Sequence, residues 1–381
     1  MDRRSFLQSS VGAVVLGGTS LGVFDSLCGP GEVQTAEFTA STPAYSVIPV
    51  VGDGKWIWTE PPKDQTGYLE PRQFDVSIGM QIQASGAARG LRATTTVPVQ
   101  LPEQKIDDVR IQTQGCVANV RQLAPEAGQL MLFAPSVAAG QVIAAVARFR
   151  LTLYKEYQGY KKEQFPAKQD FPREFRKVYM YDSPGIQTRQ KVVRDLAKKI
   201  SGQFEHPWDK AKAFHAWVWE NIKARVQVYT SVIEALRERV GDCEERAAVF
   251  VAFCRASGIP ARLVWVPNHN WAEFYLNDQD GKGHWIPAHT SAYSWFGWTG
   301  AHEMVLQKGD NIPTPENSKN QRLLADWMQW HGARPKARYM AELKPTASDT
   351  SVDAGPGARS KDAKGEWVRV GNHELDKYTR K

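Results

Sequence analysis

The chain has 381 residues, which is enough for two ordinary domains with tails. Hydrophobic residues make up 42% and charged residues 23%, close to the values for soluble globular proteins, so a mainly disordered chain is excluded. The formal charge is +7, but the 48 Lys and Arg residues are spread along the chain. We therefore expect no nucleic-acid partner, and we attribute the charge to solubility; an anionic cell envelope stays open as a partner.

The first residues carry an export signal. Arg3 and Arg4 are followed by a Phe-Leu pair and by an apolar stretch over 11–23, which is too short to span a bilayer as a mature helix. Adjacent arginines in this setting resemble the twin-arginine signal, which is read by a receptor that passes folded cargo. We predict a signal peptide over 1–36 and a periplasmic or secreted protein without a stable membrane span. An ordinary secretory signal or an uncleaved anchor is the alternative.

The next part of the chain reads as strands. Residues 37–70 are rich in Pro, Gly and Thr and predict an extended lead-in. From 71 to 160 the apolar residues recur with period two, most clearly over 76–82 and 143–153, which is typical of strands with one buried face. We predict a small all-β sandwich over 71–160, and nothing in it indicates catalysis.

Helical periodicity begins after a basic, proline-containing linker over 161–184. Gly202 is placed to end the first helix, and Pro207 suits the first position of the second. Ser231, with a glutamate three positions later, predicts a capping box that starts a third short helix.

The fourth predicted helix begins at Cys243. Asp242 is placed as its N-cap, and the helix is closed by the Gly-Ile-Pro run at 258–260. Period two then returns in three segments, over 262–266, 271–276 and 285–288, with a polar turn at 277–281. Helices followed by an antiparallel sheet predict an α+β domain over 185–344. We expect residues 345–381 to form a polar, loosely ordered tail.

The cysteines do not form a disulfide framework. Cys28 lacks the small preceding residue that a lipoprotein signal needs, so we predict no lipidation there. Cys116, Cys243 and Cys254 would remain in the exported protein. Cys243 and Cys254 fall in one predicted helix, about 16 Å apart along its axis, which is beyond disulfide reach. At least one thiol therefore stays free outside the cytoplasm.

Cys243 is the candidate nucleophile because of its position. A helix N-terminus presents unpaired N–H groups and the positive end of the dipole, which stabilise a thiolate and lower its pKa. The same N–H groups can receive an oxyanion. Cys254, on the apolar face of the same predicted helix, is expected to be an inert core residue.

His269 is the candidate base. His269, Trp271 and Glu273 project to one face of a predicted strand whose other face is apolar, so we expect His269 to point away from the core. A nucleophilic cysteine needs such a base from elsewhere in the fold.

These residues together resemble the core of the transglutaminase-like superfamily. The resemblance covers about 186–311 and rests on Gly241-Asp242-Cys243, the helix through 250–262, His269-x-Trp271-x-Glu273 and Trp285-Ile286-Pro287. It implies a papain-like or transglutaminase-like core with a Cys, His and Asp triad. It also implies cysteine-dependent acyl transfer on peptide or glutamine-type amides through a thioester. We expect hydrolysis rather than cross-linking, because water is abundant outside the cytoplasm.

One position departs from the family pattern. His289 stands where the Trp-x-Pro-x-Asp run of the family has its Asp. A neutral His289 can accept a hydrogen bond from His269, which leaves Cys243, His269 and His289 as the predicted catalytic set. Alternatively, another carboxylate orients His269, or catalysis is lost and the chain is a binding or scaffold module of the cell envelope.

The two histidines are expected to touch. A turn centred near residue 279 pairs residues whose numbers add up to about 558, which makes His269 and His289 cross-strand neighbours. Protonation of His289 would set two like charges together, so we expect activity to fall steeply on acidification through a titration of the pair.

A metal site made of Cys243, His269, His284 and His289 has suitable ligand types, but the spacing matches no closed zinc site. We predict no metal and no cofactor. The expected partner is a peptide or protein substrate, with a cell-envelope peptide among the candidates.

Overall fold

A computed structural model describes residues 60–225, 227–267, 269–292, 295–300, 302–346, 359–361 and 367–369. The predicted signal peptide over 1–36 and most of the predicted lead-in over 37–70 lie outside this part of the chain. The fold class is α+β, as the sequence predicted. None of the helices in the described ranges has the length and apolar character needed to cross a membrane.

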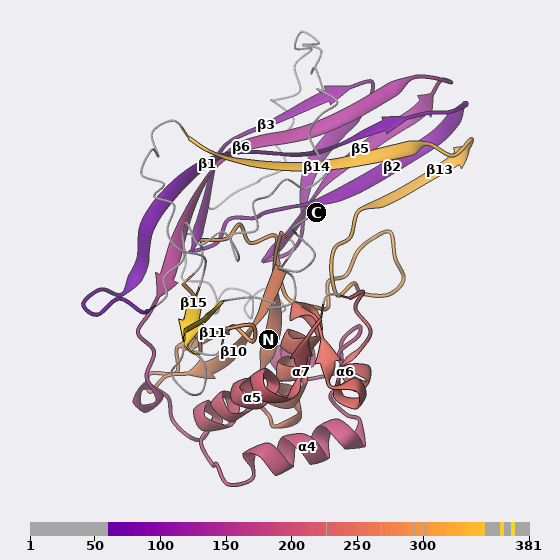
Figure 1. The fold of residues 1–381 in the computed structure, drawn as a ribbon. Coiled ribbons are helices and arrows are strands. Elements are labelled where there is room, and N and C mark those ends of the chain that lie inside the picture. The colour runs from indigo at the N-terminus through magenta and orange to yellow at the C-terminus, as the bar shows by residue number, and fades with distance from the viewer. Residues whose placement is uncertain are drawn as a thin grey trace. The chain divides into compact units, whose positions relative to one another are not determined.

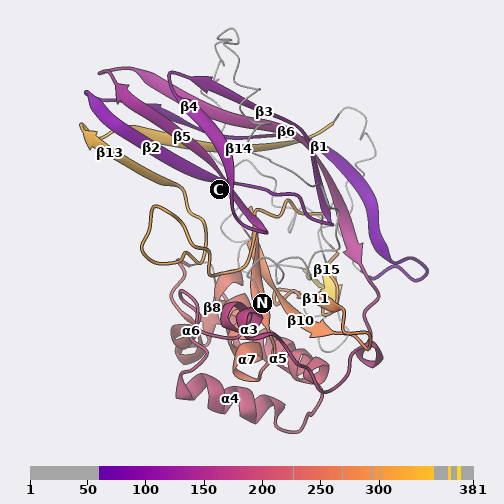
Figure 2. The ribbon, with the colours of Figure 1, turned by 180° about the vertical axis from the view of Figure 1, so that it is seen from behind.

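Long antiparallel strands form the first part of the chain (Figures 1 and 2). They are β1 (Gly67–Gln83), β2 (Ala88–Val97), β3 (Gln104–Gln114), β4 (Val117–Ala124), β5 (Ala127–Val137) and β6 (Val142–Tyr157). The alternate residues of β1 from Phe74 to Ile82 are buried in a core that also takes side chains of β2, β5 and β6. The period-two pattern predicted this arrangement correctly.

Two strands from the end of the chain complete the sandwich, which the sequence did not predict. They are β13 (Trp327–Gly332), which pairs with β2, and β14 (Lys336–Pro345), which pairs with β1 and places Ala341 opposite Ile78. The sequence pattern places both segments in the domain over 185–344. They join the sandwich because β1 and β2 each have a free edge that can pair with a further strand. The local pattern in 327–345 does not show which strand the segment will pair with.

The helices gather around one buried helix, α7 (Figure 2). Every residue from Ala247 to Cys254 in this helix is fully buried. Helices α4 and α5 come from the predicted segments, with Gly202 at the end of α4 and Pro207 at the start of α5. The helices are η2 (Lys162–Gln164), α3 (Arg173–Tyr179), α4 (Lys191–Ser201), α5 (Pro207–Asn221), α6 (Val232–Glu238) and α7 (Cys243–Ala256).

The remaining strands form the sheet against which α7 packs. They are β9 (Ala261–Val266), β10 (His269–Asn277), β11 (Gly283–Ala288) and the short β12 (Gln307–Lys308). Two further short strands, β7 (Lys223–Ala224) and β8 (Val240–Gly241), form a separate parallel pair. Strand β12 pairs with β9 on one side and with β5 on the other. The sheet is therefore continuous from β11 to β13, in the order β11-β10-β9-β12-β5-β2-β13. The tail carries one further strand pair, β15 (Arg359–Lys361) with β16 (Trp367–Arg369).

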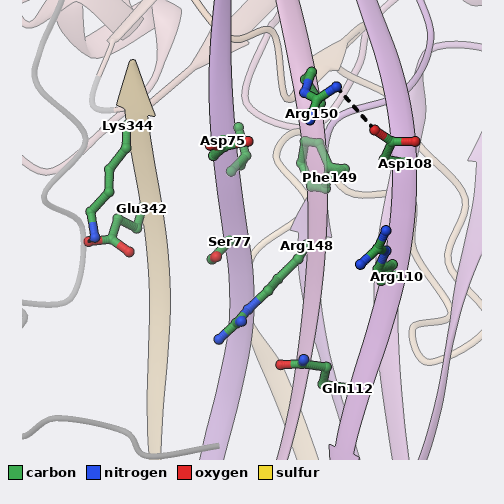
Figure 3. A pocket seen from close by; sticks show the side chains of 11 residues that line it. Asp75, Ser77, Asp108, Arg110, Gln112, Arg148, Phe149, Arg150, Glu342 and Lys344 are labelled. Carbon is green, nitrogen blue, oxygen red and sulfur yellow. Dashed lines mark ion pairs between the residues drawn. The ribbon is translucent and has the colours of Figure 1, made fainter. Parts of the chain in front are cut away.

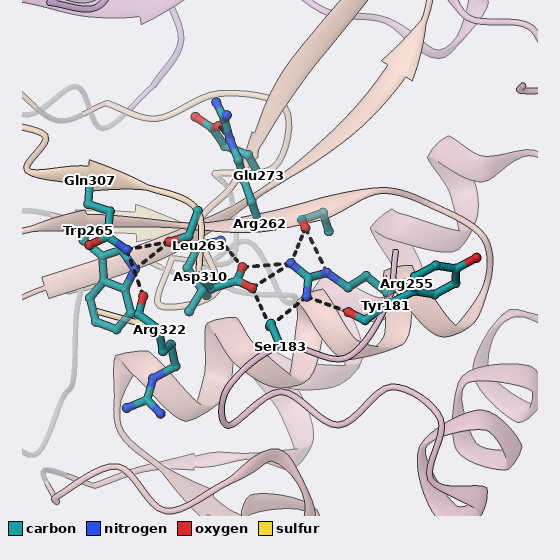
Figure 4. A network of polar contacts seen from close by, with 12 residues as sticks. Tyr181, Ser183, Arg255, Arg262, Leu263, Trp265, Glu273, Gln307, Asp310 and Arg322 are labelled. Carbon is teal, nitrogen blue, oxygen red and sulfur yellow. Dashed lines mark hydrogen bonds and ion pairs between the residues drawn. The ribbon is translucent and has the colours of Figure 1, made fainter. Parts of the chain in front are cut away.

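A buried ion pair fixes the end of α7 to the segment after β12 (Figure 4). The guanidinium of Arg255 donates to both carboxylate oxygens of Asp310, at 2.9 and 2.8 Å, and both side chains are almost fully buried. Asp310 also accepts from the hydroxyl of Ser183 at 2.5 Å and from the backbone N–H of Leu263 at 3.2 Å. Because each charge has several partners, this pair holds the nucleophile helix in place against the sheet.

Candidate functional site

Cys243 is the first residue of α7, as the sequence predicted. Asp242 caps the helix in a capping box, in which the Glu245 carboxylate accepts from the backbone N–H of Asp242 at 2.9 Å. The backbone N–H of Cys243 donates to the Asp242 carboxylate at 2.7 Å. This N–H group, which we expected to receive an oxyanion, is therefore already engaged by the cap.

The electrostatics of the thiol differ from our expectation. Burial raises the pKa of Cys243 well above its ordinary value, and the negative charge of Asp242 raises it further. The backbone N–H of Asn270 acts in the opposite direction by hydrogen bonding to the sulfur. The expected low pKa is thus wrong for this arrangement, because burial and the acidic cap outweigh the helix dipole.

His269 is the first residue of β10. The apolar face of this strand, with Ala272 and Phe274, packs into the helical core, while Trp271 belongs to a separate cluster on the opposite face. This is the alternation that the sequence predicted. Cys243 and His269 line the same cleft, which has a volume of about 450 Å³.

The His269 ring meets His289. Their Nε2 atoms are 3.0 Å apart, and their ring centroids lie 4.9 Å apart with the planes inclined by 29°. The predicted contact is confirmed, but the register differs by two residues, because Ala272 pairs with Ala288. Trp271 also stacks on His289, with the centroids 5.8 Å apart and the ring planes 18° apart.

The turn explains this difference. It is closed by a hydrogen bond from the backbone N–H of Asp278 to the carbonyl of Lys282, and Gly281 supplies the positive φ of 78° that it needs. The turn is thus centred on residue 280 and not on 279, which moves each cross-strand partner by two positions.

Both histidines are neutral near pH 7. Burial, followed by the positive charge of Arg246, lowers the pKa of His269 to about 4. Burial also lowers the pKa of His289 well below its ordinary value, and the neighbouring His269 lowers it further. Since the two Nε2 atoms face each other, one ring donates and the other accepts, and protonation of both would break the contact. No carboxylate in the described residues hydrogen-bonds to the His269 ring.

His215 is a site residue that the sequence analysis missed. It lies on α5, is buried, and donates through Nε2 to the backbone carbonyl of His289 at 3.0 Å. Burial lowers its pKa to about 4, so the donor is a neutral ring. The only signal in the sequence is that His215 follows Phe214 on the buried part of a predicted helix, which gives no reason to place it beside His289.

Of the four candidate metal ligands, His284 lies apart from Cys243, His269 and His289. His284 lies at the turn end of β11, where it hydrogen-bonds to Asp278 at 2.7 Å and its ring contacts Phe165. Across the described ranges, no group of three or more His, Cys, Asp or Glu side chains is placed to hold a metal ion.

The other cysteines have no comparable setting. Cys254 is fully buried in the helical core, as expected, and Cys116 lies at the edge of the sandwich core, where its thiol contacts the carbonyl of Ala144. All three described cysteines are free.

A second hollow, of about 480 Å³, lies on the outer face of the sandwich (Figure 3). Arg110 and Arg148 point over it, and Arg150 pairs with Asp108 at 3.3 Å. No thiol and no imidazole lines it, so the nucleophilic chemistry belongs to the cleft at Cys243.

The comparisons with known proteins agree with this site. Residues 194–290 match the family model of the transglutaminase-like superfamily. This part of the chain is thus similar to the core of that superfamily. The matched range contains Cys243, His269 and His289.

Solved structures extend the likeness beyond the transglutaminase-like domain. A "putative cysteine protease" from Cytophaga hutchinsonii matches 76% of this chain and 96% of its own, with a TM-score of 0.50 and 15% identity. A "putative protease" from Parabacteroides distasonis ATCC 8503 has a TM-score of 0.25 over 64% of this chain and 49% of its own, at 13% identity, which is too remote to inform the fold. The first match shows that this fold occurs in another protein.

A relative from Haemophilus influenzae, called "Uncharacterized protein", is 33% identical over 93 residues. The match covers 23% of this chain and 25% of that relative. The chain thus spans only about a quarter of the relative it matches.

Proposed function

We propose that the chain is a cysteine-dependent acyl-transfer enzyme that cleaves peptide or glutamine-type amides through a thioester. The observation that carries the proposal is the position of Cys243 at the start of a buried helix, in one cleft with a neutral His269 that hydrogen-bonds to His289. The transglutaminase-like match and the fold shared with a protein called a cysteine protease support the same reaction class.

The charges of the site determine how the reaction starts. Because the pKa of Cys243 is raised and that of His269 is lowered to about 4, the resting pair is a thiol and a neutral imidazole. His269 therefore acts as a general base that takes the thiol proton while sulfur bonds to the substrate carbonyl carbon. The imidazolium then returns this proton to the leaving nitrogen as the C–N bond breaks, which leaves a thioester on Cys243.

The second half of the reaction releases the acyl group. A water molecule adds to the thioester carbonyl and gives a proton to His269, the C–S bond breaks, and the sulfur recovers the proton. The products are a carboxylic acid and an amine. An amine in place of water would give transamidation. We propose hydrolysis, since water is present at far higher concentration than any amine outside the cytoplasm.

The direct test is the Cys243→Ala variant. It should lower amide turnover at least about 1000-fold and abolish a hydroxylamine-sensitive acyl adduct detected by intact-protein mass spectrometry. Cys116→Ala is the matched control, because Cys116 lies in the strand-rich part away from the cleft, and it should keep both turnover and adduct. Turnover or adduct formation that persists in Cys243→Ala would refute the proposed nucleophile.

One observation favours a second candidate, a non-catalytic binding module. His289 stands where the family has its orienting Asp, and the pKa of the partly buried Cys243 thiol is raised. A module of this kind would bind peptides in the cleft without forming an adduct on Cys243. Peptide binding by calorimetry, together with the absence of any adduct in the wild-type protein, would support this candidate over the enzyme.

We also propose export by the twin-arginine route to the periplasm or the medium, on the strength of Arg3 and Arg4. Replacing both with lysine should retain the precursor in the cytoplasm, as measured by fractionation and immunoblotting. Normal export of the double variant would rule out this route and leave an ordinary secretory signal.

A further inference from the structure

The cleft at Cys243 has a wall that does not belong to the transglutaminase-like domain. Cys243 and His269 lie on one side, while the β-sandwich contributes Ile78 from β1, Thr96 from β2 and Met340 from β14. Since β14 is an edge strand of the four-stranded sheet and follows the transglutaminase-like region in the chain, a strand far from Cys243 in the sequence helps to build the site.

A third wall is the segment over 321–326, which is fixed at Leu324 and at Arg322. The hydroxyl of Thr96 donates to the carbonyl of Leu324, and the backbone N–H of Leu324 donates to the Gln307 side chain at 2.9 Å. Arg322 donates to the carboxylate of Glu244, the residue after Cys243 in α7, at 2.6 Å. These bonds hold the segment at a set distance from Cys243, so the cleft is preformed and its walls can discriminate between substrates.

The lining of the cleft is mostly apolar, and its charged residues are acidic. Most of the lining side chains are apolar, among them Trp265, Met304, Leu306 and Leu323. The charged groups that line the cleft are carboxylates, those of Asp242, Glu244 and Asp326. No Lys or Arg is found among its described lining residues, and the guanidinium of the nearby Arg322 is engaged by Glu244. A carboxylate on the substrate would therefore lose water and meet no cationic partner in the lining, whereas an aliphatic side chain would gain contacts.

We propose that this cleft selects peptides in which the residue bearing the attacked carbonyl is a large aliphatic one. It should discriminate against acidic residues at the same position. The inference rests on the proposed acyl-transfer function and names the substrate class for it. The volume of about 450 Å³ is sufficient for a short extended segment of peptide with a side chain of leucine size. The β-sandwich thereby acts as the specificity wall of the enzyme.

The test compares three substrates that differ in a single residue. Acetyl-Ala-Xaa aminomethylcoumarin amides with Xaa as Leu, Gln or Glu are assayed with the full-length mature protein. We expect kcat/KM for Leu to exceed that for Gln about 10-fold and that for Glu about 100-fold. The matching peptidyl acyloxymethyl ketones, which alkylate a nucleophilic cysteine, should modify Cys243 in the same order of rate.

A charge placed on the wall should reverse the preference. Leu323 is 36% exposed, so Leu323→Arg can be introduced with little effect on packing. It should raise kcat/KM for the Glu substrate about 10-fold and lower it for the Leu substrate. Val228→Arg is the matched control, because Val228 is 89% exposed and does not line the cleft. The control should leave the ratio between the substrates unchanged.

The outcomes separate this inference from the proposed function. If Cys243 reacts and the substrates are hydrolysed, but Leu, Gln and Glu are equivalent or Glu is preferred, the substrate class is wrong and the enzyme stands. If neither the amides nor the ketones react at Cys243, the proposed function fails first. An unchanged substrate ratio in Leu323→Arg would show that the segment over 321–326 does not contact the acyl side.

Discussion

Replacing His289 with aspartate is expected to make Cys243 react about 10-fold faster, or more, with iodoacetamide at pH 6. His289 is fully buried and contacts the His269 ring, and no carboxylate in the described residues hydrogen-bonds to that ring. An aspartate there would stabilise the imidazolium, and the imidazolium would stabilise the thiolate. A shift of one pKa unit in the thiol changes the thiolate fraction tenfold. The neighbouring Arg246, whose charge lowers the pKa of both histidines, would help to keep the new carboxylate ionised.

The dependence of turnover on pH should differ between the wild-type protein and His289→Asp. Since the pKa of His269 is about 4, the base stays neutral through mildly acidic solution. We therefore expect turnover to stay nearly level down to about pH 5 and to fall as the ring is protonated near pH 4. A histidine with an ordinary pKa would lose activity at a higher pH. His289→Asp should raise the pKa of His269, and the acid limb should then report the thiolate–imidazolium pair.

His289→Ala provides the contrast. It removes the hydrogen-bond partner of His269 and leaves a cavity beside Trp271 and Trp295, so turnover should fall by about 100-fold or more while the fold is retained. Circular dichroism checks the fold, and labelling with a peptidyl ketone checks the thiol. Unaltered turnover in His289→Ala would show that His289 does not orient the base.

Local patterns in the sequence predicted the local structure. The start of α7 at Cys243 follows from the Asp242 cap, and the strand pattern of β1 follows from its alternating buried residues. Pairing between distant strands has no such signal. For this reason the local pattern did not place β13 and β14 beside β2 and β1, although β14 contributes Met340 and Ala341 to the cleft.

In the candidate site, too, the sequence predicted what depends on neighbouring residues and not what depends on distant parts of the chain. The contact between His269 and His289 was predictable because a hairpin joins their strands, and the error of two residues came from one turn glycine, Gly281. The pKa of Cys243 was not predictable. A helix N-terminus favours a thiolate, but the effect of burial depends on how closely the sheet and the sandwich cover the thiol, which only the assembled structure shows.

The buried pair of Arg255 and Asp310 should dominate the stability of this helix-and-sheet region. Asp310→Ala removes both bonds to the guanidinium and the acceptor for Ser183, and it leaves a buried charge without its counterion. Breaking such a pair on one side typically costs about 3 to 5 kcal/mol. We expect a loss of that size in the free energy of unfolding, measured by urea titration with an unchanged slope.

Two further variants establish that the buried charge is the cause. Asp195→Ala breaks the exposed pair with Lys191 on α4 and should change the free energy of unfolding by at most about 0.5 kcal/mol. The double variant Arg255→Met, Asp310→Leu removes both charges and should recover most of the loss, because no buried ion is left unpaired. If Asp310→Ala is no more destabilising than Asp195→Ala, the pair does not hold α7 to the sheet. In that case the position of Cys243 depends on the apolar packing around Ala247 to Cys254 alone.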